Sequence, residues 1–385
     1  MERPNYEDQS MESATQALML QTSDLPSLNV TDLTEYGPVS WSDFTRNYCK
    51  LQLIYLNHVV TFSVFTFIGL IGNITLLSVI LRTAGLRNAP NILLINVVVA
   101  DLLYMVIATP FGILHELTPC WLYGSLGCKF RHYLPDVAQA VGILSLAALS
   151  RERYNAIVRG LQSRISRSTR RTMVVVASTW IVGLLVASPV FNLTRTSGYG
   201  ILCQYLPMAL VGSQVYMVLK FLFLYVIPLC YISINYVRLA RSLCAPTMVD
   251  LAQNQSSANP IQARKRLAQI VLVITVLFGI LWFPYYVYFL WFVFNNDNIV
   301  SSNQDKIRYF RHFYYYSSLA NSCVNPFVVF TMSSAHRKSI VQCFQRSGKN
   351  PKGKRTLIVR HGGMSCRVST SSYSVANSGT VVSKI

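Results

Sequence analysis

Long apolar segments separated by short polar ones dominate the hydrophobicity pattern of this chain. After about residue 50, seven apolar runs follow one another, each near or above the roughly 20 residues that cross a bilayer as a helix. They cover residues 52–81, 89–115, 126–158, 171–190, 214–242, 267–294 and 309–331, and the last is the least apolar. In lipid every backbone N–H and C=O must be bonded internally, and the sequence lacks the short alternating segments of a barrel. The pattern therefore predicts an all-α bundle of seven membrane-spanning helices.

The composition agrees with a protein whose main solvent is lipid. Of the 385 residues, 52% are hydrophobic and only 13% are charged, and the mean hydropathy of +0.37 is high for a soluble domain. The net charge of +19 does not indicate nucleic-acid binding, because the basic residues lie between apolar runs instead of on one folded surface. We expect no nucleic-acid partner.

Lys and Arg gather in alternate connections and predict the orientation of the chain. They lie in segments 159–171 and 264–266, and from residue 337 onward there are ten basic and no acidic residues. The positive-inside rule places these segments in the cytoplasm and the N-terminus outside the cell. We expect a multi-pass protein of the plasma membrane whose first helix acts as a signal anchor, since no cleavable signal peptide is visible.

The same pattern divides the chain into four parts. Residues 1–51 contain eight of the fifteen acidic residues and predict a disordered extracellular tail, and residues 52–331 form the seven-helix domain. Residues 332–346 predict a short amphipathic eighth helix lying on membrane lipid, and residues 347–385 a disordered cytoplasmic tail.

Three kinds of modification are expected from short motifs. Asn29 and Asn192 are glycosylation sites on the outer side, and Cys343 in the eighth helix is a palmitoylation site. The serine-rich stretch 369–374 is a phosphorylation site, with a plain disordered tail as the equally weighted alternative.

Several polar side chains occur inside the apolar runs. Asn73 and Asp101 lie within the first two runs, and Asn321, Ser322 and Asn325 share the seventh. Polar groups are costly in lipid and usually face the bundle interior, where they join helices or change partners during function. We weigh a structural network equally with a switching role, and the two are compatible.

The inner end of the third run carries Glu152, Arg153 and Tyr154. Taken alone, a charged pair at a helix end is most often a membrane anchor. However, Pro284 in the sixth run and Pro326 in the seventh each free a backbone carbonyl and predict kinks near the middle of the membrane. Kinked helices can swing at their inner ends, which favours a switching role for the charged pair.

These motifs together resemble the rhodopsin-like (class A) G-protein-coupled receptors over residues 52–345. The matching residues are Gly72, Asn73, Asp101, Cys128, Glu152, Arg153, Tyr154, Trp180, Pro228, Tyr236, Trp282, Pro284, Asn325 and Pro326. Within that family the chain is most similar to the neuropeptide branch that contains bombesin, endothelin and CCHamide receptors. This similarity rests on segments 87–91, 121–129, 147–150, 278–285, 289–292 and 320–326.

The resemblance implies a receptor that passes the binding of an extracellular neuropeptide to a heterotrimeric G protein. It implies that Glu152 holds Arg153 at rest, that Arg153 moves towards Tyr236 on activation, and that Trp282 relays ligand contact to helix six. We expect the G protein to bind near Arg153 and Leu161. Coupling to Gq is expected from the bombesin group, and arrestin is expected to bind after tail phosphorylation.

Some positions depart from the family pattern. Phe330 stands where the last tyrosine of the Asn-Pro motif is usual, Gly142 where helix three usually has Ser, and Gly160 where the second cytoplasmic loop usually has Pro. Arg264 is basic where some receptors place an acid that pairs with Arg153, which argues against a charged latch at that point. The effect of these changes on switching is left open.

The family pattern also implies a disulfide between Cys128 and Cys203. Both are on the outer, oxidising side, where the bond would hold the second outer loop over the ligand pocket. Cys49 and Cys120 are also placed outside as a second pair, but connectivity does not follow from sequence.

The outer halves of the helices are expected to line the ligand pocket. Asp136 would be a buried carboxylate that needs a cation, supplied by Lys220 or by the peptide. For the aromatic residues, packing and ligand contact weigh equally. A monoamine is disfavoured, because Pro135 occupies the position where amine receptors carry their acid. The ligand-binding residues that we expect are Asp136, Lys220, Trp282, Tyr285, Tyr286, Phe289, Arg308, Arg311 and Tyr315.

Other classes of protein fit the sequence less well. A transporter should show repeated halves around a central ion site, and no internal repeat is visible. No set of nucleophile, base and orienting residue and no cluster of metal ligands is apparent, so we expect no enzyme, no cofactor and no metal. A class A receptor for a non-peptide ligand remains the main alternative.

Overall fold

The computed structural model describes residues 56–86, 88–117, 120–121, 123–159, 169–197, 202–207, 210–243, 255–295, 304–347, 358–361 and 364–367. Asn29, Leu161 and the serine-rich stretch 369–374 lie outside these ranges, as does the predicted N-terminal tail. The chain divides into two compact units, Met1–Arg337 and Lys338–Ile385. In the second unit, β3 (Ile358–His361) pairs with β4 (Met364–Arg367) in an antiparallel hairpin.

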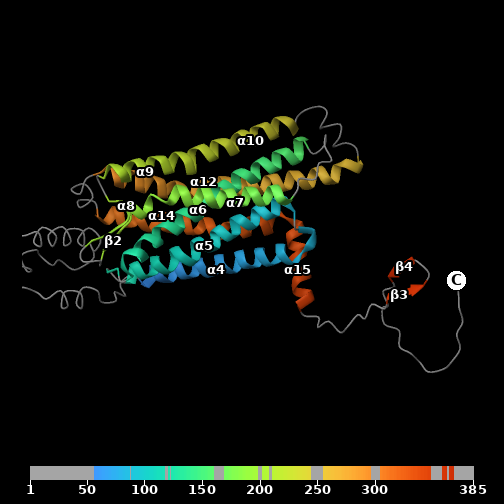
Figure 1. The fold of residues 1–385 in the computed structure, drawn as a ribbon, viewed down its shortest axis with the longest axis horizontal. Helices are drawn as coiled ribbons and strands as arrows, with labels where there is room; N and C mark the ends of the chain where they lie inside the picture. The colour runs from blue at the N-terminus through green and yellow to red at the C-terminus, as the bar shows by residue number, and fades with distance from the viewer. Residues whose placement is uncertain are drawn as a thin grey trace, which may run out of the picture. The chain divides into compact units, whose positions relative to one another are not determined.

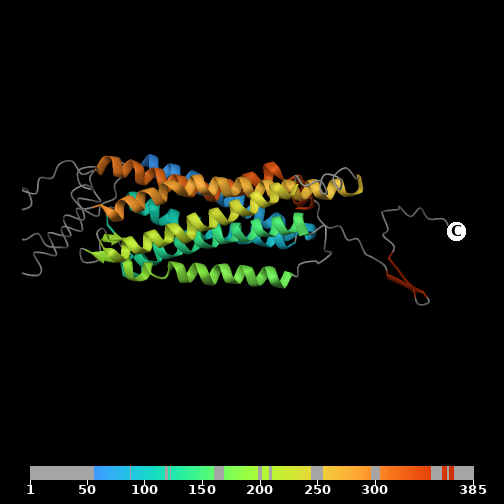
Figure 2. The same ribbon diagram turned by 90° about the horizontal axis from the view of Figure 1, so that it is seen from above.

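The first unit is a bundle of long helices that run side by side (Figure 1), and the view turned by 90° shows the same arrangement (Figure 2). This confirms the seven-helix fold predicted from the apolar runs. The helices are α4 (Leu56–Arg82), α5 (Ala89–Leu117), α6 (Gly124–Tyr154), α7 (Thr169–Ala187), α9 (Val211–Phe221) continued by α10 (Ile227–Leu243), α12 (Gln255–Phe294) and α14 (Gln304–Met332). Shorter helices are η2 (Ala84–Leu86), η3 (Asn155–Arg159), α8 (Val190–Leu193) and α15 (Ser334–Ser347).

Helix α14 differs from the others in composition. Six described helical segments are long and apolar enough to cross a membrane, and α14 is not one of them. It nevertheless packs against α12, α4 and α5, and its polar side chains are buried against these neighbours. A helix whose polar residues face the bundle interior needs less apolar surface in total, which explains why the seventh run was the least apolar. The buried polar residues are His312, Ser317, Ser318, Asn321, Ser322 and Asn325.

The bundle has apolar side chains on its outside and polar ones among those inside. Phe67 and Leu185 are 67% and 66% exposed, whereas Asn73 and Ser145 are fully buried. This distribution suits a lipid surround, because apolar side chains lose nothing by facing hydrocarbon and polar ones find partners only between helices.

Small residues let α4 approach its neighbours closely. A Cβ on Gly72 would lie 2.8 Å from Pro326 Cγ on α14. One on Gly69 would lie 2.5 Å from Met105 Sδ and 2.8 Å from Cys323 Sγ. Since real Cβ atoms do not come that close, both positions require glycine for the observed packing.

A buried asparagine joins three helices near the middle of the bundle. Asn96 on α5 donates to Ser145 Oγ on α6 at 2.8 Å and to Thr179 Oγ1 on α7 at 3.0 Å. The indole N–H of Trp180 donates to Asn96 Oδ1 at 2.8 Å. Both polar side-chain atoms of Asn96 thus have partners, as buried amides in a low-dielectric interior require.

The fifth transmembrane helix is interrupted by a short π-helix, η4 (Leu222–Val226), between α9 and α10. A π-turn places one more residue in the turn than an α-helix does. Tyr225 lies in this turn, and its hydroxyl donates to the backbone carbonyl of Gly279 on α12 at 2.8 Å.

The start of α15 has a local explanation. Ser333 separates α14 from α15, and its hydroxyl accepts from the backbone N–H of His336 at 3.4 Å, as an N-cap residue does. The predicted eighth helix, 332–346, therefore corresponds closely to α15, whose side chains beyond Val341 are not described. Its predicted contact with lipid, and palmitoylation at Cys343, stay predictions.

Candidate functional site in the outer half of the bundle

A disulfide fixes the segment between α8 and α9 to the N-terminal end of α6. Cys128 on α6 is bonded to Cys203, with 5.6 Å between their Cα atoms, which confirms the predicted bond. Cys203 lies in strand β2 (Leu202–Gln204), which pairs antiparallel with β1 (Arg195–Ser197). Trp121 and Phe111 pack against the bond. The hairpin is therefore anchored covalently at the end of the bundle that we expect to lie outside the cell.

Cys120 is also disulfide-bonded. Cys49, which we expected as its possible partner, lies outside the described residues, so this pairing stays a prediction.

A buried ion pair lies below the hairpin. Lys220 Nζ on α9 is 2.6 Å from Asp136 Oδ1 on α6. The residues are only 1% and 6% exposed, so both charges are removed from solvent. Of the two cations that we considered for Asp136, Lys220 or a group of the peptide, the structure places Lys220 beside it. A buried ion pair persists only where good geometry and further hydrogen bonds offset the loss of hydration.

Three tyrosine hydroxyls complete the surroundings of the ion pair. Tyr205, two residues after Cys203, donates to Asp136 Oδ2 at 2.5 Å, and Tyr216 on α9 donates to the same oxygen at 2.9 Å. Lys220 donates to the hydroxyl of Tyr285 on α12 at 2.7 Å. The cluster therefore connects the outer loop, α6, α9 and α12 through polar bonds.

Aromatic side chains continue from this cluster towards the membrane centre. The ring of Tyr285 meets Trp282 edge-on with centroids 5.5 Å apart, and Trp282 meets Tyr104 edge-on at 5.7 Å. Trp282 also contacts Phe278 one turn further in, at 5.9 Å. Edge-to-face contacts at these distances are favourable and depend on geometry, so Tyr285 and Trp282 are packed directly against each other.

Other aromatic residues predicted for the pocket belong to the same wall. Tyr286 accepts a hydrogen bond from Gln139 Nε2 at 3.1 Å. The rings of Phe289 and Tyr205 meet edge-on at 5.2 Å, and Tyr315 stacks on Tyr314 at 4.6 Å. The contacts of these aromatic side chains are compatible both with a role in packing and with contact to a ligand.

The remaining two pocket residues, Arg308 and Arg311, lie on the first turns of α14. Both are partly buried. Their positions, three residues apart, place two positive charges on the same side of the helix near its N-terminal end. The bonds described for Asp136 go to Tyr205, Tyr216 and Lys220.

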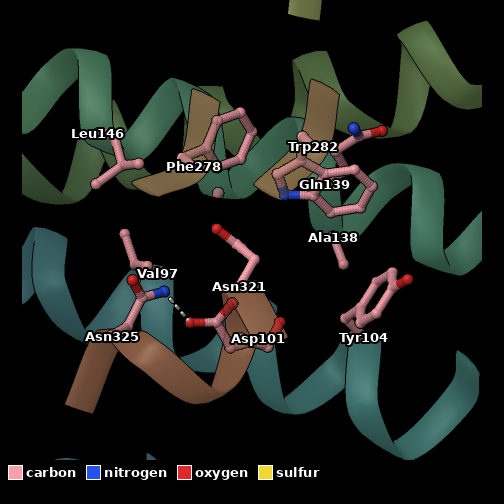
Figure 3. Close-up of a pocket in the computed structure, with 12 residues that line it drawn as sticks. Val97, Asp101, Tyr104, Ala138, Gln139, Leu146, Phe278, Trp282, Asn321 and Asn325 are labelled. Carbon is pink, nitrogen blue, oxygen red and sulfur yellow. Dashed lines mark hydrogen bonds between the residues drawn. The ribbon is translucent and has the colours of Figure 1, made fainter. Parts of the chain in front are cut away.

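A small cavity next to Trp282 is lined by side chains of α5, α6, α12 and α14 (Figure 3). Asp101 lies at its floor, and its Oδ2 accepts from Asn325 Nδ2 at 2.6 Å. Neither the indole N–H of Trp282 nor Oε1 of Gln139 has a protein partner, and both residues line the cavity. The space open to the centre of a water molecule in this cavity is about 20 Å³, which is enough for about one water. A water there could hydrogen-bond to the Trp282 N–H and to Gln139 Oε1.

A second polar contact joins the first and seventh transmembrane helices. Asn73 Nδ2 donates to the carbonyl of Gly69 at 2.9 Å and to that of Ser322 on α14 at 2.8 Å. Together with the Asp101 to Asn325 bond, it ties α4 and α5 to the segment of α14 around Pro326.

At the inner end of the bundle, α12 packs against the third and fifth transmembrane helices. The hydroxyl of Tyr236 on α10 donates to the carbonyl of Ala268 on α12 at 2.9 Å. Ala268 also belongs to an apolar cluster with Ile157 and Leu239, against which Tyr154 packs. Arg153 is 4% exposed at this end of α6. The described conformation is thus closed around Arg153.

Several residues of the cluster were missed by sequence reasoning. Tyr216 lies four residues before Lys220, and this spacing places both on one face of a helix, so a helical-wheel argument from Lys220 could have found it. Tyr205 follows the predicted disulfide by two residues, but no rule of sequence says where a loop side chain points. Gln139 gave no signal beyond its place in an apolar run.

Comparison with known proteins identifies the family. The model of the 7 transmembrane receptor (rhodopsin family) matches residues 72–328. The chain belongs to the rhodopsin family of seven-transmembrane receptors. The matched part contains the ion pair, the cavity and the inner contacts described above. This is a family of receptors and not of enzymes.

Curated relatives of this receptor carry peptide names. It is 26% identical over 312 residues to "Bombesin receptor subtype-3" of Ovis aries, covering 78% of each chain. It is 31% identical over 313 residues to "Neuropeptide CCHamide-1 receptor" of Drosophila melanogaster, covering 76% of this chain and 62% of that receptor. With "[Phe13]-bombesin receptor" of Bombina orientalis it shares 28% identity over 289 residues, covering 72% and 74% of the two chains.

Proposed function

We propose that this rhodopsin-family receptor binds an extracellular peptide of the bombesin or CCHamide kind and passes the signal to a heterotrimeric G protein. The observation that carries the proposal is the alignment, over more than two thirds of this chain, with receptors named for such peptides. The predicted ligand residues support it, because they lie on the third, fifth, sixth and seventh helices and would serve a ligand with several groups.

The charge arrangement argues for a peptide over a small amine. The carboxylate of Asp136 is already neutralised by Lys220 and accepts from two tyrosines, so it is not waiting for a ligand ammonium. A class A receptor for an amine would need an accessible anion, and Asp136 is 6% exposed. Arg308 and Arg311 offer positive charge near the outer end, where acidic or carbonyl groups of a peptide would be bound.

The placement in the plasma membrane follows from the same proposal. The N-terminus and the β1–β2 hairpin would be extracellular, and the basic connections cytoplasmic. Asn192 on α8 is exposed, as a glycan acceptor must be. Glycosylation at Asn29 and Asn192, palmitoylation at Cys343 and contact of α15 with lipid form part of this proposal.

On the cytoplasmic side we place the G-protein site at Arg153 and Leu161. Opening of α12 would break the contact between Tyr236 and Ala268 and expose Arg153, with Glu152, Tyr154, Trp282, Pro284, Asn325 and Pro326 serving the switch. A ligand favours the open state by binding it more tightly than the closed one. Coupling to Gq, and arrestin binding to a phosphorylated tail, complete the proposal.

The test expresses the receptor in cells that carry a promiscuous G protein and records calcium release against a peptide panel that includes bombesin and CCHamide-1. We expect a response to one peptide at nanomolar concentration. Surface-expressed Arg153→Ala serves as the signalling-dead control. Silence across the panel, with surface expression confirmed, would overturn the peptide assignment and favour a non-peptide ligand.

A further inference from the structure

Lys220 holds two helices at once. Its ammonium group is 2.6 Å from Asp136 Oδ1 on α6 and 2.7 Å from the hydroxyl of Tyr285 on α12. The ammonium also lies 4.6 Å from the centre of the Tyr285 ring. Lys220 itself is on α9, so one side chain joins the third, fifth and sixth transmembrane helices. We name Asp136, Lys220 and Tyr285 the polar tie.

The attachment point on α12 is close to the place where that helix can bend. Tyr285 follows Pro284, whose ring removes a backbone hydrogen bond within α12. On the other side of the proline, Trp282 contacts Tyr285 edge-on. The inner segment of α12 packs around Ala268. The bond between Lys220 and Tyr285 therefore holds the part of α12 after Pro284, and Pro284 is the position at which the helix can bend.

Stability alone is a poor explanation for the polar tie. Replacing a buried ion pair by apolar residues is often neutral or stabilising, because desolvation of the charges opposes their attraction. The bond from Lys220 to Tyr285 adds a cross-helix contact that an apolar pair would not provide. A directional contact of this kind is useful where the protein must favour one arrangement of its helices over another.

We propose that the polar tie is the restraint that keeps α12 in its closed position, with Lys220 and Tyr285 as positioning residues. The inference rests on the receptor function proposed above, since it concerns the same switch. In this proposal the bend at Pro284 changes when α12 opens, and the outer arm turns so that Tyr285 leaves Lys220. A substitution that weakens the polar tie should therefore open the receptor in the absence of any ligand.

A matched pair of variants separates this restraint from a general effect on the cluster. Tyr285→Phe removes the hydroxyl on α12 that accepts from Lys220 at 2.7 Å and also contacts the hydroxyl of Tyr205 at 3.2 Å. Tyr216→Phe also removes one hydroxyl bonded to the same ion pair, but Tyr216 lies on α9, the helix that carries Lys220. The two changes are chemically identical, and only the first breaks a connection to α12.

The measurement is the distance between the inner ends of α7 and α12 in purified receptor in lipid nanodiscs. Spin labels are attached through unnatural ketone side chains at the exposed positions Arg171 and Arg266, which leaves the native cysteines intact. Pulsed electron resonance then gives the populations of closed and open receptor. No ligand and no G protein is needed, so a failed peptide panel does not affect the result.

We expect Tyr285→Phe to raise the ratio of open to closed receptor about ten-fold, the effect of one hydrogen bond to a charged group present only in the closed state. Tyr216→Phe should leave the ratio unchanged. The double variant Asp136→Asn with Lys220→Met removes both charges together and should also open the receptor. Equal populations in Tyr285→Phe and Tyr216→Phe, or a double variant that folds and stays closed, would overturn the proposal.

Discussion

The junction at Asn96 allows the stability of the bundle to be tested with defined numbers. Asn96→Leu keeps the size of the side chain and removes three hydrogen bonds, to Ser145, Thr179 and Trp180. Each such bond contributes about 0.6 kcal/mol on average between membrane helices, and about 1.7 at most. The indole N–H of Trp180 is also left without an acceptor, which costs about 1 kcal/mol or more.

Together these terms predict a loss of about 2 to 4 kcal/mol in unfolding free energy. For a chain of this size that is a fall of about 4 to 8 °C in the melting temperature, at roughly 2 °C per kcal/mol. The assay heats purified receptor and measures the monomeric fraction that survives by size-exclusion chromatography. Ser178→Ala is the control, because its hydroxyl is exposed and bonds only to Val175 within α7.

A double-mutant cycle at Asn96 and Trp180 is a more severe test of this junction than either single variant. Trp180→Phe removes the indole donor, so in the double variant with Asn96→Leu no orphaned N–H remains. The combined loss should therefore be smaller than the sum of the single losses by about 1 kcal/mol. A melting temperature of Asn96→Leu within 1 °C of the wild type, or strictly additive losses, would refute the account of this junction.

Three further predictions concern single positions. Arg153→Ala should abolish G-protein activation in a nucleotide-exchange assay while ligand binding stays largely intact; preserved exchange would contradict the role given to Arg153. Gly72→Ala should lower the melting temperature, because its Cβ would lie 2.8 Å from Pro326 Cγ, while Gly142→Ala, with nothing within 4 Å, should be neutral or stabilising by up to about 1 kcal/mol. Cys203→Ser should destabilise the receptor by about 2 to 5 kcal/mol and reduce its surface level, measured by antibody staining of intact cells.

Much of the architecture followed from the sequence because it depends on length and polarity alone. A run of apolar residues long enough to cross a bilayer has few other folded arrangements. The disulfide between Cys128 and Cys203 followed from a family pattern. The cost of a lone buried charge predicted a cation beside Asp136, with Lys220 and the peptide as the two candidates. These inferences need no knowledge of how the helices are rotated.

The contacts that were not predicted all depend on helix rotation or on loop geometry. The junction at Asn96 requires three helices to turn particular faces towards one another, and many rotations would satisfy the same apolar pattern. Tyr205 reaches Asp136 only because β2 is anchored next to α6. The π-turn at η4 leaves no mark in the apolar periodicity of a helix that is apolar nearly all round.

That single π-turn also sets the register between the two ends of the receptor. In an unbroken α-helix, residues 220 and 236 would differ by about 160° around the axis, at about 100° per residue, and would point to nearly opposite sides. One extra residue in the turn reduces the difference to about 60°, so that Lys220 can face Asp136 while Tyr236 faces α12. In a relative without the turn, the side chain that corresponds to Lys220 should occur one position away in the sequence. A residue-by-residue alignment without a gap would then match the inner half of this helix correctly. In the outer half it would pair each residue with a neighbour of its true counterpart.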